Sequence, residues 1–271
     1  MMIFLLILCL IKLNPIESHG KMINPPQRGS MWRFGFDVVA NYNDMSNYCG
    51  GFVRHWDKNG GKCGVCGDPW DQNPRDHEPG GQYATGKIGK TYHEGQIINI
   101  TVDITANHYG YFEFRLCQND EFMKAVTQEC FDKHLLLINE NNEKVKTLQE
   151  KEYLEKDLDK YKYFVKDKGN AIINIKATLP KGITCRHCVI QWKYHSANRF
   201  GDKVNNKAVS CLGCSDKQEE FYNCADVEIL GSHNKDNNEI IEIYNKSNRL
   251  YFNFFIFVIL VIFFIHFVKI I

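Results

Sequence analysis

The sequence predicts an all-β protein, an antiparallel β-sandwich with long loops stapled by disulfides. Three observations predict this fold: short segments in which apolar and polar residues alternate, Gly and Asn turns between those segments, and an even set of cysteines between two hydrophobic ends. About 210 residues lie between these ends, which is enough for one large domain with its own core.

The alternation is clearest in QIINITVDIT, residues 96–105, where four β-branched apolar residues occupy every second position. This is the period of a strand with one buried face. Residues 112–116 and 173–179 repeat the pattern, and the segments CVIQWKYH (188–195) and ADVEI (225–229) are further candidates. Short strands of this kind, separated by turns, favour an antiparallel sandwich.

The N-terminus carries a secretory signal. Residues 3–11 are wholly apolar, which is too short a run to span a bilayer and matches the hydrophobic region of a signal peptide. The small residue Ser18 stands where signal peptidase cleaves. We therefore expect residues 1–18 to be removed, which makes His19 the first residue of the mature protein.

The cysteines agree with secretion. Eleven are present, and Cys9 lies in the signal, so the mature chain keeps ten. An even set in an oxidising compartment predicts up to five disulfides, whose connectivity does not follow from spacing. Three pairs have C-x-x-C spacing, which in a cytosolic protein would suggest zinc or redox chemistry. The predicted disulfide cysteines are Cys49, Cys63, Cys66, Cys117, Cys130, Cys185, Cys188, Cys211, Cys214 and Cys224.

The C-terminus carries a second hydrophobic signal. Residues 250–268 are mostly apolar and long enough to cross a bilayer, and a polar linker, 231–249, precedes them. Residues 250–271 are predicted to be an anchor, either a transmembrane helix or the signal for a lipid anchor. The protein is accordingly expected to enter the secretory pathway and to stay on the extracellular face of the cell membrane or be secreted.

Other features of the composition narrow the class of partner. The formal net charge of +1 gives no indication of a nucleic-acid partner. Two sequons, at Asn99 and Asn245, permit N-glycosylation in a secreted protein. Residues 139–170 are dominated by charge, and we expect a solvated insertion containing a short helix.

A free N-terminal histidine is a copper ligand in its own right. The α-amine of His19 and its ring nitrogen Nδ1 can close a chelate ring on one metal, and a second imidazole would complete three nitrogen ligands. Such a set suits copper. Among the other histidines, His108 stands out because it lies in DITANHYGYFEF, in the tight connection between two predicted strands, where the scaffold can hold its ring.

The chain also resembles a known family. Between His19 and about Leu230 the motifs HGKMINPPQRGSMWRFGF, NYND, CGG, GGKCGVCGD, TANHYGYFEF, CVIQWKY and FYNCADVEI stand in order. They are similar to those of the lytic polysaccharide monooxygenases of auxiliary activity family fifteen. The resemblance implies that residues 19–230 form an immunoglobulin-like or fibronectin type III-like sandwich with one copper ion. It implies oxidative cleavage of chitin or cellulose, using dioxygen or hydrogen peroxide and an external electron donor.

The resemblance assigns the site residue by residue. His19 and His108 match the two histidines that bind copper in the family, and Ala106 would leave room on the open axial side of the metal. Phe221 matches the aromatic residue on the opposite axial side, with Tyr222 as the alternative. Hydrogen abstraction would then occur at C1 or C4 of a sugar in a crystalline chain.

Further roles follow from the same resemblance. Gln191 and Tyr194 are candidates for groups that orient bound oxygen species, although a regular strand puts them on opposite faces. The protein is expected to be flat around the metal, with residues 22–32 and 107–111 supplying that face. Tyr109 or Tyr111 would stack on sugar rings, while Tyr111 could equally be a strand residue.

Two segments depart from the family pattern. Residues 140–168 are longer and more charged than expected, and the cysteine placement in residues 198–218 differs. Because the predicted anchor would keep the enzyme at a cell surface, chitin near that surface is the favoured substrate. The rival hypotheses are a non-catalytic copper-binding protein at the cell surface and a purely structural chitin-binding module.

Overall fold

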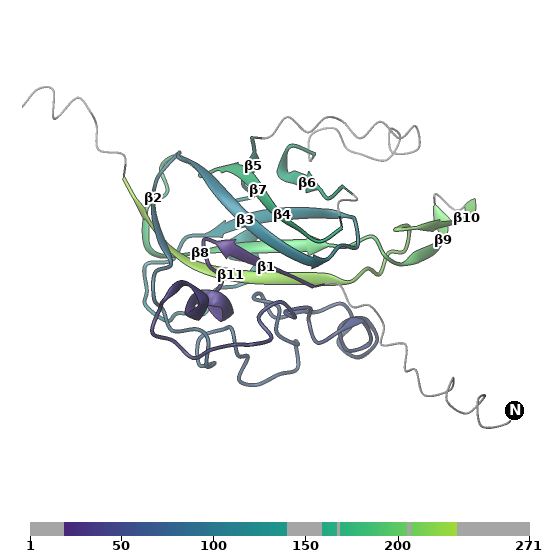
Figure 1. Ribbon diagram of the computed structural model, residues 1–271, viewed down its shortest axis with the longest axis horizontal. Helices are drawn as coiled ribbons and strands as arrows, with labels where there is room; N and C mark the ends of the chain where they lie inside the picture. Colours follow the sequence, from purple (N-terminus) through teal and green to yellow (C-terminus); the bar gives the residue numbers. More distant parts are fainter. Residues whose placement is uncertain (1–18, 140–158, 167–168, 205–206, 232–271) are drawn as a thin grey trace, which may run out of the picture. The chain divides into compact units, whose positions relative to one another are not determined.

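Two sheets pack face to face in the computed structural model (Figure 1), which describes residues 19–139, 159–166, 169–204 and 207–231. The first sheet has the order β1 (His19–Asn24), β3 (Ile97–Ala106), β7 (Ala171–Thr178), β5 (Leu137–Ile138). The second has the order β2 (Lys90–His93), β11 (Glu220–Leu230), β8 (Cys185–His195), β4 (Tyr111–Cys117), β6 (Lys162–Phe164).

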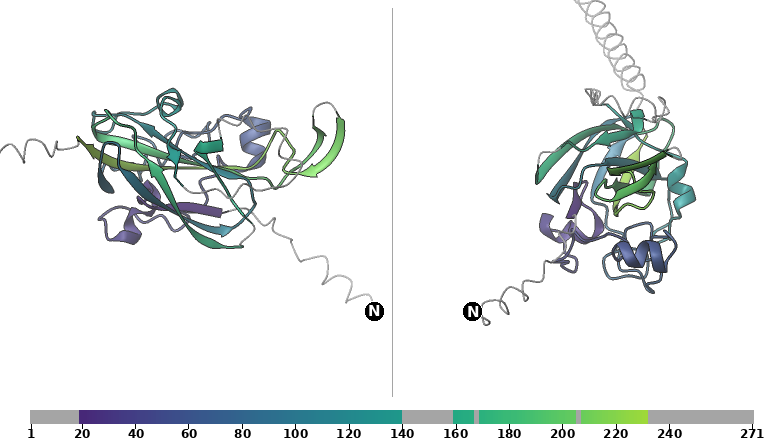
Figure 2. Two further views of the ribbon diagram at one scale, coloured as in Figure 1. Left: turned by 90° about the horizontal axis from the view of Figure 1, so that it is seen from above. Right: turned by 90° about the vertical axis from the view of Figure 1, so that its right-hand side faces the viewer.

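Within the described residues, every pairing is antiparallel except that of β2 with β11. A separate hairpin of β9 (Phe200–Val204) and β10 (Lys207–Leu212) projects from one end of the sandwich (Figures 1 and 2). The helical elements are short: η2 (Arg28–Phe34), η3 (Val53–Lys58), α2 (Gln128–Asp132) and η5 (Asp159–Tyr161).

The predicted strands are confirmed, because their alternating apolar residues form the core. In β3 the side chains of Ile98, Ile100, Val102 and Ile104 are all buried, and the polar residues between them face outward or lie half-buried. The other predicted segments lie in β4, β7, β8 and β11. The core between the sheets is therefore formed by the apolar side chains that alternate along the predicted strands.

The edge strands of both sheets were not predicted. In the second sheet, β2 and β6 are only four and three residues long, and within the described residues each pairs along one side, with β11 and β4 respectively. Strands this short carry too few alternating residues to be recognised from sequence. In the charged segment 139–170 the structure describes η5 and β6 at its end, while residues 140–158 lie outside the described part.

The ten predicted cysteines form five disulfides. Cys185–Cys188 and Cys211–Cys214 close within their C-x-x-C motifs, whereas Cys63 and Cys66 bond to different partners. The full set is Cys49–Cys63, Cys66–Cys224, Cys117–Cys130, Cys185–Cys188 and Cys211–Cys214. Cys66–Cys224 joins residues 158 positions apart and ties the long N-terminal loops to β11.

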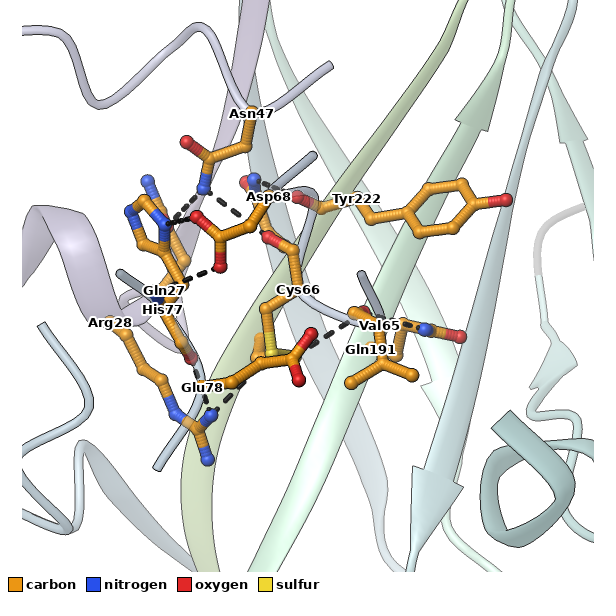
Figure 3. The surroundings of a disulfide bond; sticks show 12 residues. Gln27, Arg28, Asn47, Val65, Cys66, Asp68, His77, Glu78, Gln191 and Tyr222 are labelled. Atoms are coloured by element: carbon orange, nitrogen blue, oxygen red, sulfur yellow. Dashed lines mark hydrogen bonds and ion pairs between the residues drawn. A yellow bond between two sulfur atoms is a disulfide. The ribbon is translucent and has the colours of Figure 1, made fainter. Parts of the chain in front are cut away.

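A buried ion pair adds to this connection. Arg28, at the start of η2, donates to both carboxylate oxygens of Asp226 on β11, at 2.8 and 2.6 Å. Its third nitrogen donates to the backbone oxygen of His77 at 2.7 Å (Figure 3). Two bonds to one carboxylate fix both distance and direction, so the loop that carries η2 is held against the sheet.

Two predicted segments fall outside the described residues: the signal peptide, 1–18, and the C-terminal region, 232–271. Within the described ranges, no helix combines the length and the apolar composition needed to cross a membrane.

Candidate metal site

The strand register brings the two predicted ligands to the same end of the first sheet. His19 opens β1, and its Cα pairs with that of Ala106 at the end of β3. His108 follows only two residues later. The hydroxyl of Thr105 donates to the backbone oxygen of His19 at 3.2 Å, which ties the start of β1 to β3.

The residue after His19 is glycine for a steric reason. A Cβ at Gly20 would lie 2.6 Å from the Cδ1 of Ile104 and 3.1 Å from the ring of Trp192, both fully buried. Two positions on, the backbone N–H of Met22 donates to the buried side chain of Asn223 at 2.8 Å. β1 is therefore held to both sheets, and the histidine at its start is held with it.

The backbone of His108 is fixed on both sides. Its N–H donates to the hydroxyl of Tyr194 at 2.9 Å, and its carbonyl accepts from the N–H of Ala197 at 2.8 Å. The chain then turns sharply, with φ of 55° at Tyr109 and 80° at Gly110. Residues other than glycine rarely adopt a positive φ. A Cβ at Gly110 would also collide with the carbonyl oxygen of His195.

Two residues that the sequence analysis did not identify contact the His108 ring. The ring Nδ1 lies 2.7 Å from the amide nitrogen of Asn198 and 3.4 Å from Oε2 of Glu219. Asn198 also donates to that same Oε2, at 2.6 Å. Burial opposes the ionisation of Glu219, but hydrogen bonds from His108 and Asn198 outweigh it and hold the pKa of this carboxyl below its ordinary value.

Tyr194 and Phe221 lie together near His108. They are cross-strand partners on β8 and β11, and their ring centroids are 5.7 Å apart. Phe221 also stacks on Tyr48, with the ring centroids 5.9 Å apart. Tyr222 lies on the opposite face of β11, where its hydroxyl donates to Glu220. The geometry therefore brings Phe221, and not Tyr222, to the group formed by Tyr194 and His108.

Gln191 is not part of that group. As expected from the period of two, it faces away from Tyr194 on β8, and Cys224 is its cross-strand partner. Its amide donates to the backbone oxygen of Val65 at 2.7 Å (Figure 3). It also donates to the side chain of Gln128 at 3.0 Å. The Gln191 side chain is fully buried. Its bond to Val65 anchors the loop between Cys63 and Cys66 to the sheet.

The two tyrosines considered for sugar contact differ in exposure. Tyr109 is 42% exposed and lies directly beside His108. Tyr111 lies in β4, where its ring stacks on His195 at 5.2 Å, and burial raises its pKa to about 12. Tyr109 is thus the residue available at the surface. A cavity of about 350 Å³ lies elsewhere, against Trp70 and Arg75.

The described residues contain no group of three or more His, Cys, Asp or Glu placed to share a metal ion. The predicted donor set is of another kind: two imidazoles and a terminal amine, of which His19 would supply two nitrogens once residues 1–18 are removed. Nitrogen ligands of this kind suit copper. Both contacts to the His108 ring use Nδ1, so Nε2 is the nitrogen that a metal would take.

Comparisons with known proteins point the same way. A family model described as "Lytic polysaccharide mono-oxygenase, cellulose-degrading" matches residues 19–227. The chain is similar to a solved AA15 lytic polysaccharide monooxygenase from Thermobia domestica in the Cu(I) state, with 39% identity, TM-score 0.68, and coverage of 78% of this chain and 98% of that chain.

A chitin-binding domain from Burkholderia pseudomallei has 12% identity and a TM-score of 0.39, with coverage of 79% of this chain and 100% of that chain. No curated protein sequence matches the chain.

Proposed function

The chain belongs to the lytic polysaccharide monooxygenases, and from that premise we propose that it cleaves chitin with one copper ion held by His19 and His108. Membership confirms the resemblance seen in the sequence. The protein is a copper-dependent monooxygenase that cleaves polysaccharide oxidatively, built on an immunoglobulin-like sandwich with a single copper cofactor. The ligands, the choice of chitin and the position of attack on the sugar form the proposal.

The observation that carries the proposed ligands is the pairing of His19 with Ala106, two residues before His108. It sets the first residue of the mature chain beside the loop that bears the second imidazole. We propose that the His19 amine and Nδ1 and the His108 Nε2 are the three nitrogen ligands. When bound, copper supplies the one-electron redox chemistry that activates dioxygen or hydrogen peroxide for hydrogen abstraction at C1 or C4.

The neighbouring residues have distinct roles in this proposal. The side chain of Ala106 is a single methyl group, which is too small to block the approach of the oxidant. The ring of Phe221, which stacks on Tyr48 and on Tyr194, would face the metal with an apolar group that offers no further ligand. Tyr194 also holds the backbone N–H of His108. The side chain of Tyr109 is placed to stack on a sugar ring of the substrate.

Chitin is proposed because of where the enzyme would act. The predicted anchor, residues 250–271, would confine it to the extracellular face of the cell membrane after secretion, so its polymer must lie close to that surface. An external electron donor completes the reaction. Asn99, proposed as a glycosylation site along with Asn245, lies exposed on β3, facing away from the core.

The test is an assay on two polymers. The protein that begins at His19, loaded with copper, is incubated separately with β-chitin and cellulose, ascorbate and hydrogen peroxide, and products are analysed by mass spectrometry. We expect oxidised chito-oligosaccharides from wild type and none from His108→Ala. Oxidised products from cellulose alone would contradict the choice of chitin. Copper binding without oxidised products from either polymer would instead favour the non-catalytic copper-binding protein.

A further inference from the structure

We propose that Met45 is an oxidation site of this enzyme: turnover without polysaccharide converts its thioether to a sulfoxide, and the sulfoxide weakens the copper site through Thr105. This inference rests on the proposed function, because the oxidant is the one activated at the copper that His19 would hold. It concerns a residue whose backbone contacts β1 and whose sulfur contacts β3.

Met45 is held beside His19 by two contacts. Its backbone oxygen accepts from the N–H of Gly20, the residue after His19, at 3.2 Å. Its sulfur lies 3.5 Å from the hydroxyl oxygen of Thr105, and that oxygen lies 3.2 Å from the backbone oxygen of His19. A single side chain therefore lies between the thioether and the proposed copper ligand. Met45 is half-buried rather than enclosed in the core, which leaves it open to a molecule as small as hydrogen peroxide.

The other methionines of the mature chain have different surroundings. Six methionines are present, and Met1 and Met2 belong to the predicted signal, which leaves Met22, Met31, Met45 and Met123. Met22 and Met31 are fully buried in the folded protein. Met45 and Met123 are both half-buried, so these two are the methionines that an oxidant in solution can reach.

Met123 lies far from the proposed copper ligands. It belongs to the loop that follows β4, whereas His108 precedes that strand. The backbone oxygen of Asn119 in this loop accepts from the N–H of His187, near the start of β8, so the loop stays at that end of the sheet. The seven residues of β4 set its two ends about 20 Å apart. Met123 is therefore an internal control for oxidation by peroxide in solution.

The chemistry needs only the oxidant of the proposed reaction. Hydrogen peroxide transfers one oxygen atom to the sulfur: its O–O bond breaks, an S=O bond forms, the sulfur loses two electrons, and the other oxygen leaves with both protons as water. When polysaccharide is bound, the oxidant is consumed in cleaving it. When polysaccharide is absent, the thioether of Met45 is an oxidisable group beside the site, and its sulfoxide is polar where the thioether was apolar.

The hydroxyl of Thr105 connects this side chain to the copper ligand. A hydroxyl has one proton, and Thr105 has two acceptors within reach, the backbone oxygen of His19 and the sulfur of Met45. A thioether is a weak acceptor, so the proton goes to His19 while Met45 is reduced. The polar oxygen of a sulfoxide would compete for that proton. The backbone of His19 would then lose its bond to Thr105 and be held less firmly.

The first experiment maps oxidation by peptide mass spectrometry on the mature protein that begins at His19. The copper-loaded protein is treated with ascorbate and hydrogen peroxide without polysaccharide, and the copper-free protein receives the same treatment. We expect sulfoxide to form several times faster at Met45 than at Met123 when copper is loaded, and at similar rates when copper is removed. Added β-chitin should slow oxidation of Met45 and leave that of Met123 unchanged.

The second experiment measures Cu(II) affinity by competition calorimetry on variants of the same protein. Met45→Gln places an amide oxygen, a strong acceptor, beside Thr105, and Met45→Leu is the matched apolar control. We expect Met45→Gln to bind Cu(II) about fivefold more weakly than wild type, the effect of about one hydrogen bond, and Met45→Leu to match wild type. When each is combined with Thr105→Val, the two should bind copper alike. Thermal unfolding of each copper-free variant checks that the protein is folded.

The outcomes separate this inference from the proposed function. Equal oxidation rates at Met45 and Met123 in a copper-loaded protein that still oxidises β-chitin would overturn the inference and leave the proposed function standing. Wild-type affinity in Met45→Gln, or a loss that persists with Thr105→Val, would overturn the coupling through Thr105. If wild type itself binds no copper, the inference and the proposed function fail together.

Discussion

At the scale of single residues, the candidate site depends on positions where one atom more or less would move a ligand. Gly20 is the clearest example, since it lies beside His19 and its missing Cβ makes room for Ile104 and Trp192. The sequence identified His19 and His108 from their places in the chain. It gave no signal for Asn198 or Glu219, because their contacts with the His108 ring depend on how distant segments meet.

Replacing Gly20 with alanine should therefore damage both fold and site. We expect Gly20→Ala to lower the free energy of unfolding by about 1–3 kcal/mol, because the added methyl forces Ile104 or the start of β1 to shift. Copper affinity should fall as His19 moves. Denaturant unfolding and copper titration measure the two effects. Gly231→Ala is the control, since its Cβ would meet only ordinary contacts, and equal behaviour of the two variants would contradict the steric argument.

Glu220 should make the free energy of unfolding depend on pH in the acidic range. Burial opposes its ionisation, but hydrogen bonds from His195 and Tyr222 outweigh burial and lower its pKa to about 2. Because the folded pKa lies below the unfolded value of 4.5, this carboxylate stabilises the fold above pH 4.5, and that contribution is lost as the pH falls toward 2.

We expect wild type, but not Glu220→Gln, to lose on the order of 2 kcal/mol through this group over that range. Urea unfolding of both proteins at several pH values measures the difference. Stability curves that run parallel from neutral pH to about pH 2 would show that Glu220 does not couple protonation to folding.

At the scale of elements, the long strands could be predicted and the short ones could not. β3, β4 and β7 each bury one face, and the alternation of apolar and polar residues in their sequences indicates this directly. β2 and β6 depend on the strands beside them instead. The contact between η2 and β11 was also invisible in sequence, because nothing in Arg28 or Asp226 alone indicates that they pair.

The ion pair of Arg28 and Asp226 should be costly to break and cheaper to replace. Arg28→Ala leaves the Asp226 carboxylate buried without its partner, and we expect a loss of about 3–5 kcal/mol in unfolding free energy. The double variant Arg28→Met with Asp226→Leu removes both charges and should lose distinctly less. Chemical denaturation compares them, and a double variant less stable than Arg28→Ala would show that packing, not the unpaired charge, dominates.

At the scale of the whole domain, a disulfide links the long N-terminal loops, which lie outside the sheets, to the last strand. The sequence predicted which cysteines are bonded but not their partners, since pairing is set by the folded chain. Cys66–Cys224 spans 158 residues and joins the N-terminal loops to the last strand, whereas Cys211–Cys214 spans three.

These two bonds should differ strongly in their effect on stability. A bond that closes a long loop removes more entropy from the unfolded chain, which gives about 5 kcal/mol for Cys66–Cys224 and about 2 kcal/mol for Cys211–Cys214. Replacing both cysteines of one pair by alanine and measuring thermal and denaturant unfolding tests this. If removal of the short bond cost as much as removal of the long one, the entropic account would be wrong.

The central claim is that a free amine on His19, together with the rings of His19 and His108, holds the catalytic copper. The most direct measurement compares the domain that begins at His19 with the same domain extended by one N-terminal residue, by Cu(II) affinity and by oxidised products from β-chitin. We predict that the extension abolishes tight binding and product formation, because it turns the amine into an amide. Equal affinity and equal product yield from the two proteins would contradict the claim.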